Sequence, residues 1–133
     1  MHAQSFPESL GFDTSVREAI FEAATARLHK AFGDRVQVEV EHFDRIGPWV
    51  FLRGRMHGTD GERPYYAGTA YEARRADGTM SDVYVILLKK ADDESADNDP
   101  RSWRLADYAI GPTDVAWLTW PDKHEVPRVL FGF

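Results

Sequence analysis

The chain has 133 residues, a formal net charge of −6 and no cysteine. This length fits one domain whose core is large enough to be stable without disulfides. The lack of cysteine excludes thiol catalysis, disulfide bonds, iron–sulfur clusters and cysteine-based zinc sites. The acidic balance argues against binding to nucleic acid, and no apolar run approaches the roughly 20 residues of a membrane-spanning helix. We therefore expect one domain over residues 1–133 without membrane insertion.

Residues 1–12 show no periodic pattern, and we expect an irregular segment there. His2 and Ala3 before Gln4 resemble the end of a signal-peptidase site, where small residues precede the cleavage point. On this basis we expect an exported protein, periplasmic or secreted, from which a leader has been removed. Without export, the protein would be cytoplasmic.

The segment from Thr14 to Phe32 is predicted to form an amphipathic helix. Its apolar residues recur at helical spacing: Val16, Ile20, Ala23, Ala24, Leu28, Ala31 and Phe32. Gly33 is suited to the left-handed conformation that often follows a helix end.

From Arg35 onward the apolar period changes to two, which is typical of a half-buried strand. Further strand-like runs follow, separated by Gly, Pro and Asp: about Trp49–Met56, Tyr65–Arg74, Val83–Leu88 and Trp103–Ile110. Asp77 and Gly78 indicate a hairpin turn between the third predicted strand, Tyr65–Arg74, and the fourth, Val83–Leu88.

Residues 91–100 carry five acids and no apolar residue larger than alanine, so we expect a flexible loop. Four aspartates there offer oxygen ligands for Ca²⁺, but the run lacks the glycine and closing glutamate of an EF-hand loop: Asp92, Asp93, Asp97 and Asp99. The five histidines are scattered without an i, i+4 pair. We predict no metal site and no cofactor.

The break at Gly111 and Pro112 predicts the start of a new element. Trp117 and Trp120 follow it three positions apart, so on a helix they share one face. We expect a short C-terminal helix whose tryptophans either cap the core or form an exposed patch for a partner.

One helix followed by about five strands with short connections predicts an α+β fold with an antiparallel meander. The helix should cross the concave face of the sheet, because its apolar stripe needs an apolar partner. This arrangement is that of the cystatin-like or NTF2-like roll.

The run Trp49–Gly54, together with Trp103–Trp120, resembles an uncharacterised family of small bacterial proteins that typically carry a signal peptide. The resemblance implies an export route and a roll fold, but no activity. The run Gln37–Glu41 is similar to the hairpin motif of cystatins only superficially, since it lacks the terminal glycine and lies within a strand pattern.

Three polar residues are candidates for proton transfer in a pocket between helix and sheet. His42 continues the phase of the preceding valines, Asp107 lies in phase between Leu105 and Ala109, and Tyr84 sits in the most apolar strand. As an enzyme, the protein would be a cofactor-independent NTF2-like lyase or isomerase using these groups. No nucleophile motif is present.

The leading hypothesis is a noncatalytic binding module of the bacterial envelope, which takes a small ligand or a protein partner. Its candidate binding residues are the four tryptophans Trp49, Trp103, Trp117 and Trp120. A homodimer through the exposed face of the sheet is a further alternative.

Overall fold

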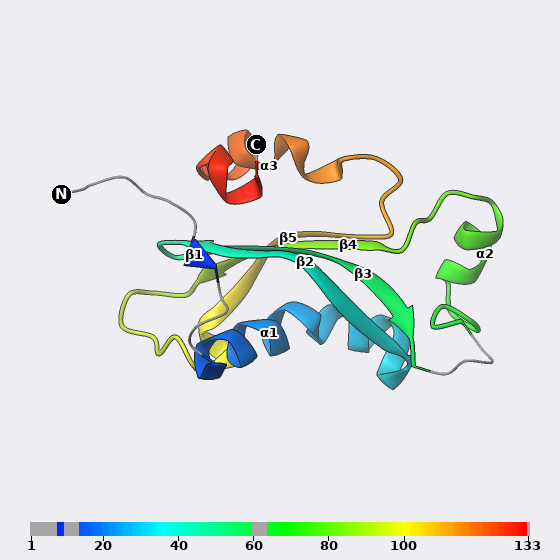
Figure 1. Ribbon diagram of the computed structural model, residues 1–133, viewed down its shortest axis with the longest axis horizontal. Coiled ribbons are helices and arrows are strands. Elements are labelled where there is room, and N and C mark those ends of the chain that lie inside the picture. The colour runs from blue at the N-terminus through cyan, green and yellow to red at the C-terminus, as the bar shows by residue number, and fades with distance from the viewer. Residues whose placement is uncertain (1–7, 10–13, 60–63, 133) are drawn as a thin grey trace.

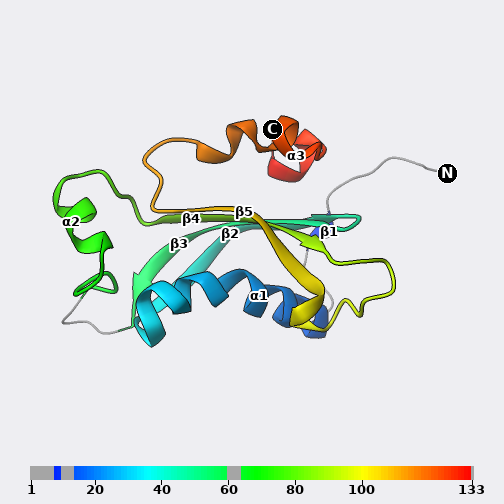
Figure 2. The same ribbon diagram turned by 180° about the vertical axis from the view of Figure 1, so that it is seen from behind.

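A computed structural model of the chain describes residues 8–9, 14–59 and 64–132. It places a long helix on one face of an antiparallel sheet and a group of short C-terminal helices on the opposite face (Figure 1). The view from behind shows the same three layers (Figure 2). The predicted α+β class, with a long N-terminal helix and a meander sheet, is confirmed. Within the described residues, no helix has the length and apolar character needed to cross a membrane.

Helix α1 spans Thr14–Phe32, the predicted bounds. Its inward face is apolar, and Ile20, Ala24 and Leu28 are fully buried against the sheet. Gly33 follows with φ of 68°, the left-handed conformation expected there, and begins a short turn of 3₁₀-helix over Gly33–Arg35. The helical spacing of the apolar residues thus located this element correctly.

The sheet has the strand order β1-β2-β3-β4-β5, and every neighbouring pair is antiparallel. The bounds are Glu8–Ser9 for β1, Val36–Ile46 for β2, Trp49–Gly58 for β3, Val83–Lys90 for β4 and Trp103–Ile110 for β5. Strands β2 to β5 form the meander, and four of the predicted strands correspond to them. The short β1 pairs with one end of β2, at Asp44 and Arg45.

The irregular segment expected over residues 1–12 is described only at Glu8–Ser9, which is strand β1. The remaining positions, including the expected cleavage point after Ala3, lie outside the described residues.

The predicted third strand, Tyr65–Arg74, is wrong. Turns occupy its first part, and helix α2 spans Tyr71–Ala76. Gly68 adopts φ of 76°, which interrupts an extended chain, and the Thr69 hydroxyl oxygen accepts a hydrogen bond from the Tyr71 amide at 3.1 Å. Such local side-chain bonds to the backbone compete with strand pairing. The expected hairpin turn at Asp77–Gly78 therefore connects α2 to β4 instead of joining two strands.

Aromatic packing also holds this segment away from the sheet. The Tyr65 and Tyr71 rings both lie 5.1 Å from the ring of Phe32 at the end of α1. The Arg75 guanidinium pairs with the Asp82 carboxylate, and the Tyr65 hydroxyl donates to the same carboxylate at 2.8 Å. These contacts tie α2 to the start of β4.

The sheet separates two apolar cores. The core on the α1 face contains Leu52, Tyr84 and Ile86 from the strands, and the core on the opposite face contains Phe51, Val85 and Leu87. Successive residues of β3 and β4 thus point to opposite faces, and both faces are buried. This explains why β4 is a continuous apolar run.

The C-terminal segment covers the second face with three short helices: η3 Ala116–Thr119, α3 Trp120–His124 and η4 Arg128–Phe131. We call these three helices the C-terminal cap. Trp117 and Trp120 are buried in it, with ring centroids 6.4 Å and 6.2 Å from the ring of Phe51. Of the two readings of the tail tryptophans, the structure shows the one in which they pack on a core.

Candidate functional site

His42 and Asp107 lie on the face of the C-terminal cap, not beneath α1. A β-bulge between Val40 and His42 shifts the pairing of β2 with β3. Another between Leu87 and Leu88 shifts the pairing of β4 with β5, so that Asp107 is opposite Leu87 and Leu105 is opposite Leu88. A bulge adds one residue to a strand and so reverses the face of everything after it. His42 is therefore out of phase with the preceding valines, and Asp107 shares the face of Ala109 but not that of Leu105.

The His42 ring bridges the sheet and the C-terminal cap. Its Nε2 atom lies 2.8 Å from the Leu130 carbonyl oxygen of η4 and 3.4 Å from Asp44 Oδ2. The ring centroid is 5.4 Å from that of Phe51. These contacts tie η4 to the sheet and account for the half-buried position of His42.

Tyr84 lies on the other face of the sheet. Its side chain is fully buried, and its hydroxyl donates to the Ala24 carbonyl oxygen of α1 at 2.6 Å. Burial raises the pKa of the Tyr84 phenol well above its ordinary value. The hydroxyl therefore stays protonated and holds α1 against the sheet.

Asp107 is paired with the C-terminal cap. Its Oδ2 atom lies 2.9 Å from His124 Nε2 and 3.0 Å from Lys123 Nζ. Burial alone would raise the pKa of Asp107, but the hydrogen bonds from His124 and Lys123 outweigh it and lower the pKa. The carboxylate is thus held ionised. Sequence reasoning did not single out His124, because only the folding of the tail brings it to β5.

The structure does not bring together the three candidate catalytic groups. His42 and Asp107 contact the C-terminal cap, while Tyr84 contacts α1 on the opposite face of the sheet. The pocket that was expected to contain all three is therefore absent from the described residues.

The four candidate tryptophans are divided between the two faces. Trp103 packs in the core beneath α1, whereas Trp117 and Trp120 pack in the core beneath the C-terminal cap. Trp49 lies at the margin of that second core, half-buried, with Lys89 Nζ 5.0 Å from its ring centroid. The four rings do not form one surface, and their role in binding stays a prediction.

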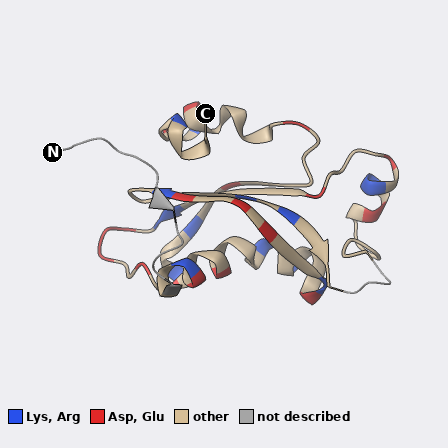
Figure 3. Ribbon diagram, viewed as in Figure 1, with Lys and Arg blue, Asp and Glu red and all other residues tan. Residues whose placement is uncertain are grey.

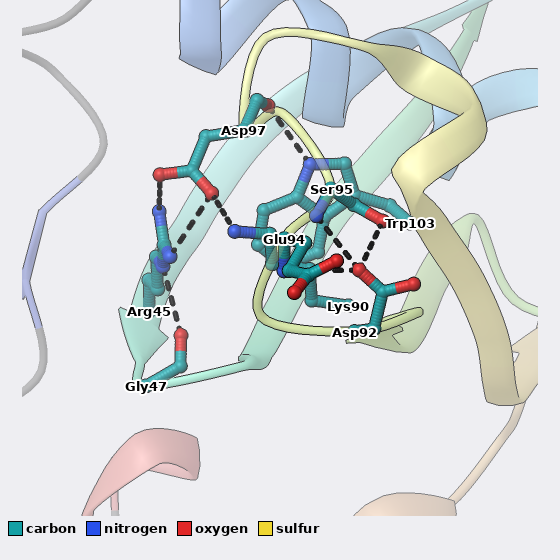
Figure 4. Close-up of polar contacts among 8 residues, drawn as sticks. All are labelled: Arg45, Gly47, Lys90, Asp92, Glu94, Ser95, Asp97 and Trp103. Carbon is teal, nitrogen blue, oxygen red and sulfur yellow. Dashed lines mark hydrogen bonds and ion pairs between the residues drawn. The ribbon is translucent and has the colours of Figure 1, made fainter.

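The acidic loop is attached to the sheet through one of its carboxylates (Figure 4). Asp97 is paired with Arg45 at 3.0 Å and with Lys90 at 2.5 Å, and the Trp103 indole donates to the Asp97 carbonyl oxygen at 3.0 Å. We call these four residues the Asp97 cluster. Hydrogen bonds from Lys90 and Arg45 lower the pKa of Asp97. The loop expected to be flexible thus has a fixed attachment point.

Two other aspartates of the loop have partners close to them in the sequence. Asp92 accepts from the Ser95 hydroxyl at 2.8 Å and from the Glu94 and Ser95 amides, and Asp99 pairs with Arg101. Across the part of the chain that the structure describes, no three His, Asp or Glu side chains gather where they would hold a metal ion.

An open groove of about 650 Å³ runs along one side of α1 and ends at the acidic loop. We call it the α1 groove. Its helix side is lined by charged, polar and aromatic side chains: Arg17, Glu18, Phe21, Glu22, Thr25 and His29. Asn98 and Pro100 line the loop side. Since the Asp97 cluster holds this loop, the groove has walls from two separately supported elements.

A smaller hollow of about 260 Å³ lies between α1 and the start of β2, and we call it the edge hollow. It shares Phe21, Thr25 and His29 with the α1 groove and adds Leu28 from the helix. Val36, Gln37 and Val38 line its strand side. The two hollows together follow one side of α1.

Charges of both signs surround these hollows. Figure 3 shows acidic and basic residues interspersed along α1, and acidic residues along β2. In the α1 groove, Arg17 lies with its guanidinium carbon 5.3 Å from the ring centroid of Phe43, and Glu18 and Glu22 are exposed. The groove offers both ionic and apolar contacts to a ligand.

No protein-family model, curated protein or solved structure matches the chain. The function of the protein is therefore inferred from the geometry of its described residues.

Proposed function

We propose that the protein is a noncatalytic binding module that takes a small ligand or a segment of a protein partner in the α1 groove. The observation that carries the proposal is the groove itself, a hollow with charged, polar and aromatic walls beside a loop that the Asp97 cluster holds in place. Binding sites commonly combine apolar walls with a few placed polar groups. Of the four candidate tryptophans, Trp103 would support the loop wall of the groove, whereas Trp117 and Trp120 pack on the opposite face of the sheet.

The geometry favours binding over the alternative of a cofactor-independent NTF2-like enzyme. Proton transfer requires an acid and a base within hydrogen-bond reach of one substrate. Tyr84 lies on the face of the sheet opposite to His42 and Asp107, and its hydroxyl is occupied by the Ala24 carbonyl. The α1 groove contains none of these three groups.

Two finer proposals accompany this one. A helix packed across a curved antiparallel sheet supports a cystatin-like or NTF2-like roll, and the resemblance of the tail to exported bacterial proteins supports a place in the bacterial envelope. Fractionation of the native host tests the second: recovery of the protein from the periplasm or medium is expected, and recovery from the cytoplasm alone would refute it.

The test of the binding proposal is a fragment screen followed by two-dimensional ¹H–¹⁵N NMR spectra. We expect fragments to shift the amide signals of Glu18 to His29 and of Asn98. Glu22→Lys should weaken the binding of cationic fragments, because it reverses a charge in the groove wall. The matched control is Asp114→Lys, an exposed charge reversal in the segment leading to the C-terminal cap. Shifts confined to other surfaces would contradict the proposal.

A further inference from the structure

We propose that the protein binds an extended segment of a partner protein as an added β-strand along the outer edge of β2. Side chains of the partner would enter the edge hollow. This inference goes beyond the proposed function, because it concerns the edge of β2 beside the α1 groove, and it specifies the class of partner: a peptide strand in which apolar residues alternate with polar or basic ones.

The first support is the free edge of β2. In the sheet, β2 lies between β3 and the two-residue β1, and β1 covers only Asp44 and Arg45. From Val36 to Val40, β2 pairs with β3 on one side, and no described strand pairs with it on the other. Alternate residues of such an edge present unpaired N–H and C=O groups, which is the template for strand addition.

The second support is that strand β1 already pairs with β2 on this side. Glu8 and Ser9 pair antiparallel with Arg45 and Asp44. The same side of β2 therefore accepts a strand at the far end, beyond the bulge at Glu41. Among the described residues, no strand covers the regular stretch Val36–Val40 of that edge, and this is where a partner would pair.

The third support is the edge hollow, which coincides with this stretch. Val36, Gln37 and Val38 form its strand side, and Phe21 and Leu28 contribute apolar surface from α1. Its volume of about 260 Å³ lies below the roughly 300–1,000 Å³ of sites that enclose drug-sized ligands, and suits individual side chains. In strand addition the backbone supplies affinity, while pockets for alternate side chains supply specificity.

The two faces of β2 indicate the alternation of the partner. Val38 and Val40 point toward α1 and are only half-buried, so an apolar side chain added beside them would bury more apolar surface. On the other face Glu39 has a side-chain exposure of 69 % and pairs with His57 at the surface. A basic or polar side chain of the partner would lie next to Glu39.

The opposite edge of the sheet is less suited to this role. Strand β5 is bulged at Ala106 along its length, and the Tyr108 amide donates to the Asp107 carboxylate at 3.0 Å. Bulges and polar groups that occupy edge amides protect an edge from pairing. Since β2 is regular from Val36 to Val40, before its own bulge, the geometry favours this stretch over β5.

The test uses the full chain and a displayed library of random peptides of about ten residues, long enough to cover the stretch. We expect selected peptides to alternate apolar with basic or polar residues and to shift the amide signals of Val36 to Val40. Each selected peptide is then made in two forms, N-methylated at one or the other set of alternate residues. One form should lose at least about tenfold in affinity, and the other less than about twofold, because only one set of N–H groups faces β2.

Protein variants supply a second readout. Glu39→Lys should weaken binding of the basic peptides, whereas Asp114→Lys should leave it unchanged. Equal binding of both N-methylated forms would overturn strand addition. Fragment binding in the α1 groove without any peptide at β2 would also overturn it while leaving the proposed function intact. If no fragment binds in the α1 groove and no peptide binds at the edge of β2, both proposals fail.

Discussion

At the scale of single residues, two β-bulges determine which side chains meet. The alternation of β2 places His42 beneath α1, and that of β5 places Asp107 beside Leu105. The bulges transfer both residues to the face of the C-terminal cap, where His42 contacts Leu130 and Asp107 contacts His124. A bulge is a tertiary feature of two paired strands, so a pattern within one strand does not reveal it.

Asp107→Asn should destabilise the protein by about 1 kcal/mol at pH 7, because it weakens the half-buried hydrogen bonds to His124 and Lys123. The pKa of Asp107 is lowered in the folded state, so its stabilisation is present above the unfolded value of about 3.9 and is lost as pH falls through the folded value. Urea unfolding at several pH values measures this. The difference from wild type should shrink below about pH 4. Asp93→Asn, at an exposed loop position, is the control.

Gly111→Ala should lower the free energy of unfolding by on the order of 2–4 kcal/mol. The residue has φ of 67°, and an added Cβ would collide with the Met80 side chain and lie 2.9 Å from the Ser81 carbonyl oxygen. Gly78→Ala is the matched comparison, since φ is 73° there but no atom lies within 4 Å. It should lose only about 1–2 kcal/mol. If urea unfolding gave the same loss of free energy for both variants, the Met80 side chain would have moved away from the added Cβ, contrary to this prediction.

At the scale of elements, segments that look alike in sequence differ in the contacts that surround them. The run Tyr65–Arg74 has strand-forming aromatics, yet its tyrosines pack on Phe32 and its Thr69 hydroxyl supports a helical turn. The acidic loop has the composition of a disordered segment, yet Asp97 meets two cations contributed by β2 and β4. In both cases, one of the partners lies far away in the sequence: Phe32 for the tyrosines and Arg45 for Asp97.

Asp97→Asn should loosen the acidic loop, because the variant leaves Arg45 and Lys90 without a carboxylate partner. We expect hydrogen exchange of the loop amides to accelerate by about fivefold, which corresponds to roughly 1 kcal/mol. The Ser102 and Ala91 amides, which bond to Asp99 and Ser102 carbonyls, report this change. Asp92→Asn is the control, as its contacts are confined to the turn at Ser95. Unchanged exchange rates of the loop amides in Asp97→Asn would contradict the role of Asp97 in attaching the loop to the sheet.

At the scale of the whole molecule, the sheet is shared by two cores. Alternate residues of β3 and β4 face α1 and the C-terminal cap, so each strand depends on both layers. The candidate site lies at the margin of the core beneath α1, along one side of α1 and at the edge of β2, where Leu28 and Val36 belong to that core. Binding of a ligand there does not require the two cores to rearrange, which is consistent with a rigid scaffold that carries a binding surface.

Trp120→Ala should destabilise the whole molecule by about 3–5 kcal/mol, because it opens a cavity in the second core against Phe51. Leu118→Ala is the control in the same segment, since Leu118 is 53 % exposed, and it should change stability by less than about 0.5 kcal/mol. Urea unfolding followed by circular dichroism measures both. A loss confined to the C-terminal cap, with the sheet unaffected, would show that the two cores unfold independently.

Apolar spacing along the chain predicts α1, the four strands β2 to β5 and the α+β class, because it reports which faces are buried. It did not reveal helix α2, the bulges, the partners of Asp107 and Asp97, or the hollow between α1 and β2. Each of these depends on residues that are distant in the chain and become neighbours only after folding. The candidate site belongs to this second group, because a groove is a relation between elements and no single segment encodes it.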